Sequence, residues 1–185
     1  MGYWNSRGLR GNAFEETINM SNERYLREKI ALIQKIPTPV VPVEMDQRTR
    51  IITKAYFDKK STVDYIGVMD GTALCFDAKE TGKNFLPFSN IHPHQVEFMK
   101  NFAGQGGLAF LLVHFSARGL YYLLPLDTLV RYFDDKEGRR SIPLEAFEER
   151  YRIAEPSPYL PFLSVVYAYR ADLVRAREEA AQGKA

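Results

Sequence analysis

The sequence predicts an α/β protein in which helices flank a mixed β-sheet, and two observations carry this prediction. Short apolar runs rich in β-branched and aromatic residues lie between turn residues, as at 65–69, 73–78 and 108–115. Longer stretches between them repeat their apolar residues with the period of a helix. Hairpin strands, a helix, and then further strands and helices are typical of an α/β sandwich.

The first predicted element is a helix from Gly11 to about Gln34. Phe14, Ile18 and Ile33 recur there at roughly helical spacing, which gives the helix one apolar face. A polar stripe borders this face and includes a glutamate, Glu15. It is open whether this stripe is a solvated edge or points Glu15 toward a functional pocket.

Residues 36–60 are predicted to project from the domain in an extended conformation. Pro37, Pro39 and Pro42 remove amide donors and hold the chain extended, so this segment cannot be a central strand. Residues 48–57 then alternate weakly and favour a strand. The alternative is a Pro-rich loop that leads into an edge strand.

The segment around Asp70-Gly71 predicts a hairpin, because this dipeptide favours a tight turn between two β-prone runs. Alternation along the second run places Asp77 and Lys79 on one face. The antiparallel return brings residues 76–78 beside residues 63–65, so the carboxylates of Asp64 and Asp77 meet.

Two adjacent carboxylates repel each other unless a cation lies between them or one of them is protonated. Mg²⁺ is commonly held by one or two carboxylates together with waters and phosphate oxygens, which fits Asp64 and Asp77. Lys79 can then position a water or stabilise negative charge on a phosphate. On the residues alone, the alternative is a turn cap at Asp64 and an exposed ion pair between Asp77 and Lys79.

The second half continues the α/β pattern after a loop at 82–92. Pro93 suits the first turn of a helix, and Gln95 lies on the buried face of that helix, where it needs a partner from the backbone or from a functional group. His92 and His94 lack a third soft ligand nearby, and His114 is expected to be a core or strand-edge residue. The further elements are strands at 108–115 and 119–125, helices at 126–133 and 144–153, and a helical tail from Arg170.

The composition fits one domain spanning residues 1–185, with an insertion at about 36–60. No apolar run approaches the roughly 18 residues that span a bilayer. The N-terminus lacks a signal-peptide core, so we expect a cytoplasmic protein without membrane contact. Cys75 is the single cysteine, which excludes an internal disulfide and a thiolate zinc cluster.

The formal net charge is only +2, but the basic residues gather near the N-terminus. Residues 1–60 contain 11 Lys or Arg against 7 Asp or Glu. Cations mixed with aromatic residues contact phosphates and stack on unpaired bases, although a solvated strand can also carry such a mixture. The candidate nucleic-acid-binding residues are Arg7, Arg10, Arg48, Arg50, Lys54, Phe57, Lys59 and Lys60.

A set of short motifs, in order and with similar gaps, resembles the RecU family of bacterial Holliday junction resolvases, a branch of the PD-(D/E)xK nucleases. The similarity runs from about residue 7 to about residue 170. The matching residues are Arg10-Gly11, Phe14-Glu15, Ile18-Asn19, Ser21-Asn22, Arg50 to Phe57, Ser61-Thr62, Asp64-Tyr65, Gly67, Phe76 to Thr81, and His94-Gln95.

This resemblance implies a role for each candidate site residue. The metal ligands would be Asp64 and Asp77, joined by Thr62 and Gln95, and the catalytic lysine would be Lys79. Glu15 would add an acidic group and Gln95 a polar helper. Many family members have Glu where this chain has Asp77, so the position of the ion can differ by about one methylene.

The resemblance further implies a restriction-endonuclease-like core with a protruding stalk at 36–60, and a Mg²⁺-dependent endonuclease, with Mn²⁺ as an alternative ion. The substrate would be four-way junction DNA in recombination and repair. Two matched nicks favour a homodimer, and a recombinase is a candidate partner. The alternatives are a non-catalytic module that binds branched DNA and a related nuclease that cuts duplex DNA.

Overall fold

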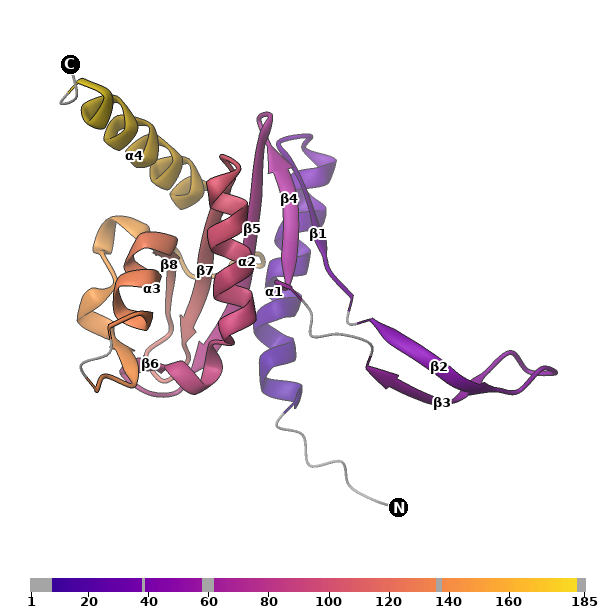
Figure 1. Ribbon diagram of the computed structural model, residues 1–185. Coiled ribbons are helices and arrows are strands. Elements are labelled where there is room, and N and C mark those ends of the chain that lie inside the picture. The colour runs from indigo at the N-terminus through magenta and orange to yellow at the C-terminus, as the bar shows by residue number, and fades with distance from the viewer. Residues whose placement is uncertain (1–7, 38, 58–61, 136–137, 183–185) are drawn as a thin grey trace.

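The computed structural model describes residues 8–37, 39–57, 62–135 and 138–182. A six-stranded sheet in the order β1-β4-β5-β7-β8-β10 forms its centre, with β5 and β7 parallel and the other neighbouring strands antiparallel (Figure 1). The predicted α/β class with a mixed sheet between helices is confirmed. The strands are β1 (Ala31–Lys35), β4 (Tyr65–Met69), β5 (Thr72–Thr81), β7 (Leu108–Phe115), β8 (Leu120–Pro125) and β10 (Arg152–Ile153).

Helices cover the two faces of the sheet in pairs. Phe76 and Phe110 point toward one face and pack with buried residues of α1 and α4. Leu111 points toward the other face and packs with buried residues of α2 and α3. Because side chains alternate along a strand, odd and even residues of β5 meet different helix layers. The helices are α1 (Gly8–Arg27), α2 (Pro93–Gly104), α3 (Leu126–Phe133) and α4 (Leu163–Gln182).

Strands β2 (Val40–Met45) and β3 (Ile52–Phe57) form a separate hairpin that extends away from the central sheet (Figure 1). Its turn is held by Asp46, whose Oδ1 accepts the N–H groups of Arg48 and Thr49 at 2.8 and 3.1 Å. The side chains of both strands are exposed apart from a half-buried Val41. At its base, Ile36 N–H donates to Asp64 O at 2.8 Å.

The prediction of a helix reaching Gln34 is wrong beyond Arg27. Lys29 adopts a positive φ of 58°, and the chain then enters β1, which pairs with β4. Ile33 is buried whereas Leu32 is 59% exposed, so residues 31–35 follow the period of a strand. Pairing with β4 therefore overrides the helical spacing of the isolated sequence.

The predicted helix at 144–153 is also wrong. Two 3₁₀ turns occupy residues 144–146 and 149–151, and β10 follows them. Phe147 packs in the core on the α2 side of the sheet, whereas Tyr151 packs on the α1 side. In a helix these two residues would share one face, so one helix could not bury both where they lie.

The structure adds elements that were not predicted and extends another. Strand β6 (Phe85–Pro87) forms inside the predicted loop at 82–92 and pairs with β9 (Ser141–Pro143). The tail predicted to be helical from Arg170 is already helical from Leu163. Among the described residues, no helix combines the length and apolar character that a membrane span requires.

Candidate active site

The β4–β5 hairpin brings the predicted carboxylates together. Asp70 and Gly71 have positive φ values of 46° and 73°, as a tight hairpin turn requires. Pairing from the turn places Tyr65 opposite Phe76. Asp64 therefore lies directly beside the segment that carries Asp77.

Each carboxylate is held by the backbone of the opposite strand. Asp64 N–H donates to Asp77 Oδ1 at 2.7 Å, and Ala78 N–H donates to Asp64 Oδ2 at 3.0 Å. Asp77 is fully buried, and Asp64 is partly buried. These two bonds fix the side chains against each other before any ligand is bound.

Lys79 and Gln95 complete this cluster. Lys79 Nζ lies 2.6 Å from Asp77 Oδ2 and donates to Gln95 Oε1 at 3.1 Å. The same Gln95 oxygen accepts the backbone N–H of His92 at 3.4 Å, at the start of α2. Gln95 is thus buried as predicted, and it fixes the lysine to the end of the helix.

Asp64 responds electrostatically to this crowding. Burial and then the neighbouring Asp77 carboxylate raise the pKa of Asp64, Lys79 and the Ala78 N–H oppose them, and the net pKa is about 6. A carboxyl whose pKa is raised toward neutrality is what two like charges in a poorly solvated space produce. The cluster therefore carries one carboxylate that a cation could stabilise in its ionised form.

The donor set fits a hard divalent cation. Asp77 Oδ2 is buried, and in the part of the chain that the structure describes no hydrogen-bond donor is aligned with it, although the Lys79 ammonium contacts it as an ion pair. Within the described residues, no three His, Cys, Asp or Glu side chains gather as a metal cluster. A pair of carboxylates matches Mg²⁺, which takes its remaining ligands from waters and substrate phosphate.

Glu15 and Thr62, the other predicted members of the site, lie in different surroundings. Glu15 belongs to α1, which packs on the opposite face of the sheet, and its Oε2 lies 2.6 Å from Lys35 Nζ. Thr62 is exposed. The structure thus brings Asp64, Asp77, Lys79 and Gln95 into contact, while Glu15 is paired with a lysine of β1.

The predicted nucleic-acid-binding residues divide into two groups. Arg48, Arg50 and Lys54 are exposed on the hairpin, and Phe57 has 73% of its surface exposed. The side chain of Arg10, in the first turns of α1, is outside the described part. Arg7, Lys59 and Lys60 lie outside the described residues.

Two other reactive residues do not join the site. Cys75 is buried, and burial raises the pKa of its thiol to about 12, so it is not a nucleophile at neutral pH. His114 Nδ1 lies 3.3 Å from Glu80 Oε2, and its ring stacks on Tyr121 at 4.2 Å. His114 is therefore a partly buried strand residue, in agreement with the sequence prediction.

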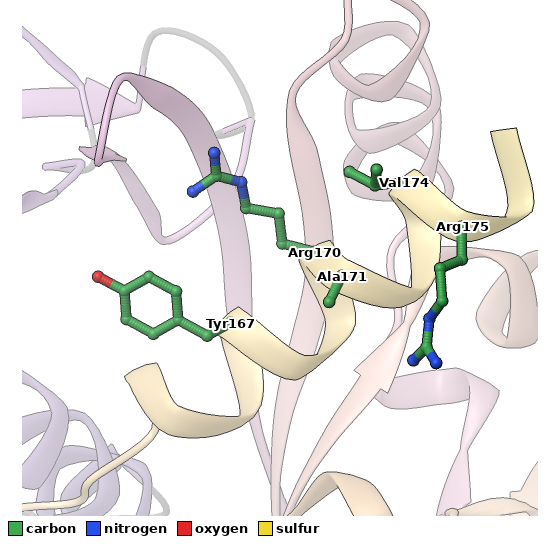
Figure 2. Close-up of a pocket in the computed structure, with 5 residues that line it drawn as sticks. All are labelled: Tyr167, Arg170, Ala171, Val174 and Arg175. Carbon is green, nitrogen blue, oxygen red and sulfur yellow. The ribbon is translucent and has the colours of Figure 1, made fainter. Parts of the chain in front are cut away.

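A hollow of about 470 Å³ lies elsewhere, along one side of α4 (Figure 2). Its lining residues all come from this helix, and none contributes to the carboxylate cluster. The lining residues are Tyr167, Arg170, Ala171, Val174 and Arg175.

Comparisons with known proteins agree on one family. The family model of RecU, Recombination protein U, matches residues 9–168. A Holliday junction resolvase RecU of Streptococcus pneumoniae serotype 19F (strain G54) is 42% identical over 163 residues, covering 85% of this chain and 82% of that protein. The Holliday junction resolvase RecU of Lactococcus lactis subsp. lactis (strain IL1403) is 44% identical over 165 residues, covering 86% of this chain and 78% of that protein.

A solved structure also resembles the fold. It is Archaeoglobus fulgidus Hjc, a Holliday junction resolvase from an archaeal hyperthermophile. The TM-score is 0.42 at 16% sequence identity, and the match covers 69% of this chain and 90% of that chain.

Proposed function

This chain belongs to the RecU (Recombination protein U) family, and we propose that it is a structure-selective endonuclease that resolves Holliday junctions in recombination and repair. The relatives of similar length are Holliday junction resolvases, and the match covers most of both chains. Family membership also agrees with the predicted restriction-endonuclease-like core. The proposal also needs a set of residues in this chain that can support phosphodiester hydrolysis.

The observation that carries the proposal is the contact of Asp64, Asp77 and Lys79 in one small cluster. A buried acid, a second acid with a raised pKa and a lysine within 2.6 Å of the first acid form an arrangement with little structural value of its own. Buried charges stabilise a fold weakly at best. Such clusters of perturbed groups are typical of functional sites.

Asp64 and Asp77 would hold a divalent cation, with Mg²⁺ as the proposed ion and Mn²⁺ as an alternative. A bound ion of this kind supplies Lewis acidity and lowers the pKa of a bound water. Thr62 and Gln95 would join the two carboxylates as further ligands, and Glu15 would act through water. Without an ion, Gln95 Oε1 accepts from Lys79, and Glu15 pairs with Lys35.

The protein groups then divide the work around the scissile phosphate. Asp64 and Asp77 would bind the ion, and the hydrogen bonds from backbone N–H groups keep both carboxylates oriented. Lys79 lies next to Asp77 Oδ2, where its ammonium can hold the attacking water or offset charge that develops on the phosphate. Gln95 keeps Lys79 at that place because its oxygen accepts one of the ammonium N–H groups.

The projecting hairpin supplies the proposed selectivity for a branched substrate. Phe57 and Tyr56 are 73% and 56% exposed near Lys54, which provides stacking surfaces beside a cation. We infer that the hairpin enters the open centre of a four-way junction. A homodimer with two-fold symmetry would supply the two matched cuts across that centre, and a recombinase is a further proposed partner.

Cleavage of a synthetic four-way junction, compared with a linear duplex of the same sequence, tests this function. We expect paired nicks in the junction with Mg²⁺, none after chelation, and slow cutting of the duplex. Equal cutting of both substrates would favour a duplex nuclease, whereas tight junction binding without nicks would favour a non-catalytic module.

A further inference from the structure

Two loops meet at the carboxyl end of the strand that carries the candidate catalytic residues. β5 and β7 run parallel and end at the same level, with Thr81 opposite Phe115. The loops that follow are joined by the bond from Ser116 N–H to Thr81 O at 2.9 Å. Residues 82–84 and 116–119 therefore lie side by side, at the strand ends where α/β proteins commonly bind ligands.

We propose that Lys83, Asn84 and Arg118, here called the cationic ledge, bind the phosphodiester backbone of the DNA strand that is cut. This inference rests on the proposed nuclease function and adds a contact surface to it. The ledge would hold phosphates that neighbour the scissile one.

The arginine of the cationic ledge is already oriented. Arg118 Nε donates to Asn84 Oδ1 at 2.6 Å, which leaves the Nη donors for another acceptor. The main chain at Asn84 is fixed in turn, because the backbone carbonyl of Asn84 accepts Leu144 N–H at 3.0 Å. A guanidinium held by an amide keeps its full charge and presents the paired donors that suit a phosphate.

The lysine has a comparable setting. Lys83 N–H donates to Thr81 Oγ1 at 3.2 Å, which fixes the turn after β5. Its ammonium lies 5.1 Å from the centre of the Phe85 ring, a weak attraction that directs the side chain without neutralising it. Both Lys83 and Arg118 are exposed.

Within the described residues, neither cation of the cationic ledge forms an ion pair. Residues 82–84 and 116–119 contain Lys83 and Arg118 but no Asp or Glu. Counting only the described residues, no carboxylate oxygen comes within 4.0 Å of either cation. Glu155 is an acidic group close to the ledge, since its Oε1 would lie 3.8 Å from a Cβ on Gly119, but it forms no ion pair with Arg118. Exposed cations that are not engaged in an ion pair are available to a polyanion.

The distance to the active site suits one continuous strand of DNA. Lys83 follows Lys79 by four residues in the sequence, so their Cα atoms lie at most about 14 Å apart. Long side chains at both positions would reach phosphates a few nucleotides apart. Contacts of this type position the backbone and carry no base information.

Junction binding without divalent metal tests the cationic ledge directly. The variant Lys83→Ala/Arg118→Ala should bind a four-way junction more weakly, and the slope of log K against log salt should fall by about 2, one for each phosphate that the variant no longer neutralises. Arg131→Ala/Arg177→Ala is the matched control, since it removes two exposed cations from α3 and α4. The control should keep a slope close to that of the wild type.

A charge-neutral variant separates orientation from charge. Asn84→Ala keeps both cations but removes the acceptor that orients Arg118, so KM should rise several-fold while kcat stays within about twofold. If the double variant keeps the wild-type salt slope while its melting temperature is normal, the cationic ledge does not bind DNA. Failure of the wild type to cut junctions would instead overturn the proposed function, and the salt slope would still decide this inference.

Discussion

The backbone N–H of Asp64 donates a hydrogen bond to Oδ1 of Asp77 at 2.7 Å, so one candidate metal-binding residue orients the other. The bond crosses from the start of β4 to β5, two strands that the Asp70-Gly71 turn pairs in register. The carboxylates are consequently arranged by the fold itself and need no ligand to bring them together. Because the two carboxylates are already ordered, binding an ion costs little conformational entropy.

Replacing Asp77 by Asn should abolish cutting and leave junction binding nearly unchanged. The substitution removes a charge that serves the ion and preserves the shape of a fully buried side chain. We expect the single-turnover rate to fall by about 10³-fold or more, because a bound metal ion contributes several kcal/mol to such reactions. Asp127→Asn, at an exposed position of α3, is the control and should cut normally. Normal cleavage by the Asp77 variant in Mg²⁺ would contradict the assignment.

The raised pKa of Asp64 predicts a pH dependence of stability in metal-free buffer. The folded protein holds the Asp64 proton up to about pH 6, above the ordinary value of 3.8. Folded molecules therefore bind more protons than unfolded ones between these values, so stability falls as pH rises through the window and stays lower above it.

Asp64→Asn should remove this fall in folding stability at higher pH. At pH 7.5 the variant should melt a few °C above the wild type, since about 1 kcal/mol shifts Tm by ~2–4 °C in a domain of this size. At pH 3.5 the two proteins should melt nearly together, because Asp64 is then neutral in the folded state and mostly neutral in the unfolded state. Thermal scans at the two pH values measure this difference, and an equal gap at both would disprove the link to titration.

Lys79→Met should destabilise the metal-free protein, because it leaves the buried Asp77 carboxylate without its cation. Loss of one partner of a buried ion pair costs about 3–5 kcal/mol, which corresponds to a fall in Tm of roughly 10 °C. The double variant Asp77→Asn/Lys79→Met removes both charges and should recover most of the loss. If the double variant melts no higher than the single one, packing rather than charge accounts for the effect.

Removal of the hairpin should erase the preference for junctions and leave the core folded. Residues 40–57 can be replaced by a short Gly-rich loop, because Ile36 and Asp64 already lie side by side at the hairpin base. The ratio of duplex Kd to junction Kd should approach one, while the far-UV CD of the remaining elements is preserved. As a milder test, Phe57→Ala should weaken junction binding by about 1–3 kcal/mol if the ring stacks on a base. A preserved ratio would show that selectivity lies elsewhere.

Local patterns were sufficient for the part of the site that lies on the β4–β5 hairpin. The Asp70-Gly71 turn and the alternation of Asp77 and Lys79 both act within a few residues, so the sequence predicts them directly. The burial of Gln95 also follows from helical spacing. Its contact with Lys79 depends on how α2 packs on β5, which the motif resemblance implied and helix periodicity could not.

The errors have a common physical origin in long-range pairing. Residues 31–35 match a helix locally, yet β4 offers them a strand partner. The approach of the two strands is close, since a Cβ on Gly67 would lie 2.4 Å from Leu32 O. Glu15 illustrates the same limit, because its position in the helical stripe could not reveal that α1 covers the face of the sheet opposite Asp77.

The hairpin base has a consequence for where a substrate would be cut. Ile36 anchors one leg of the hairpin to the carbonyl of Asp64, the same residue whose carboxylate borders the reaction centre. If the hairpin recognises the junction and Asp64 serves the cut, both roles would depend on the position of one residue, Asp64. The length of the hairpin would then set the distance from the branch point to the cut. A longer hairpin would move the cut along the strand without abolishing cleavage.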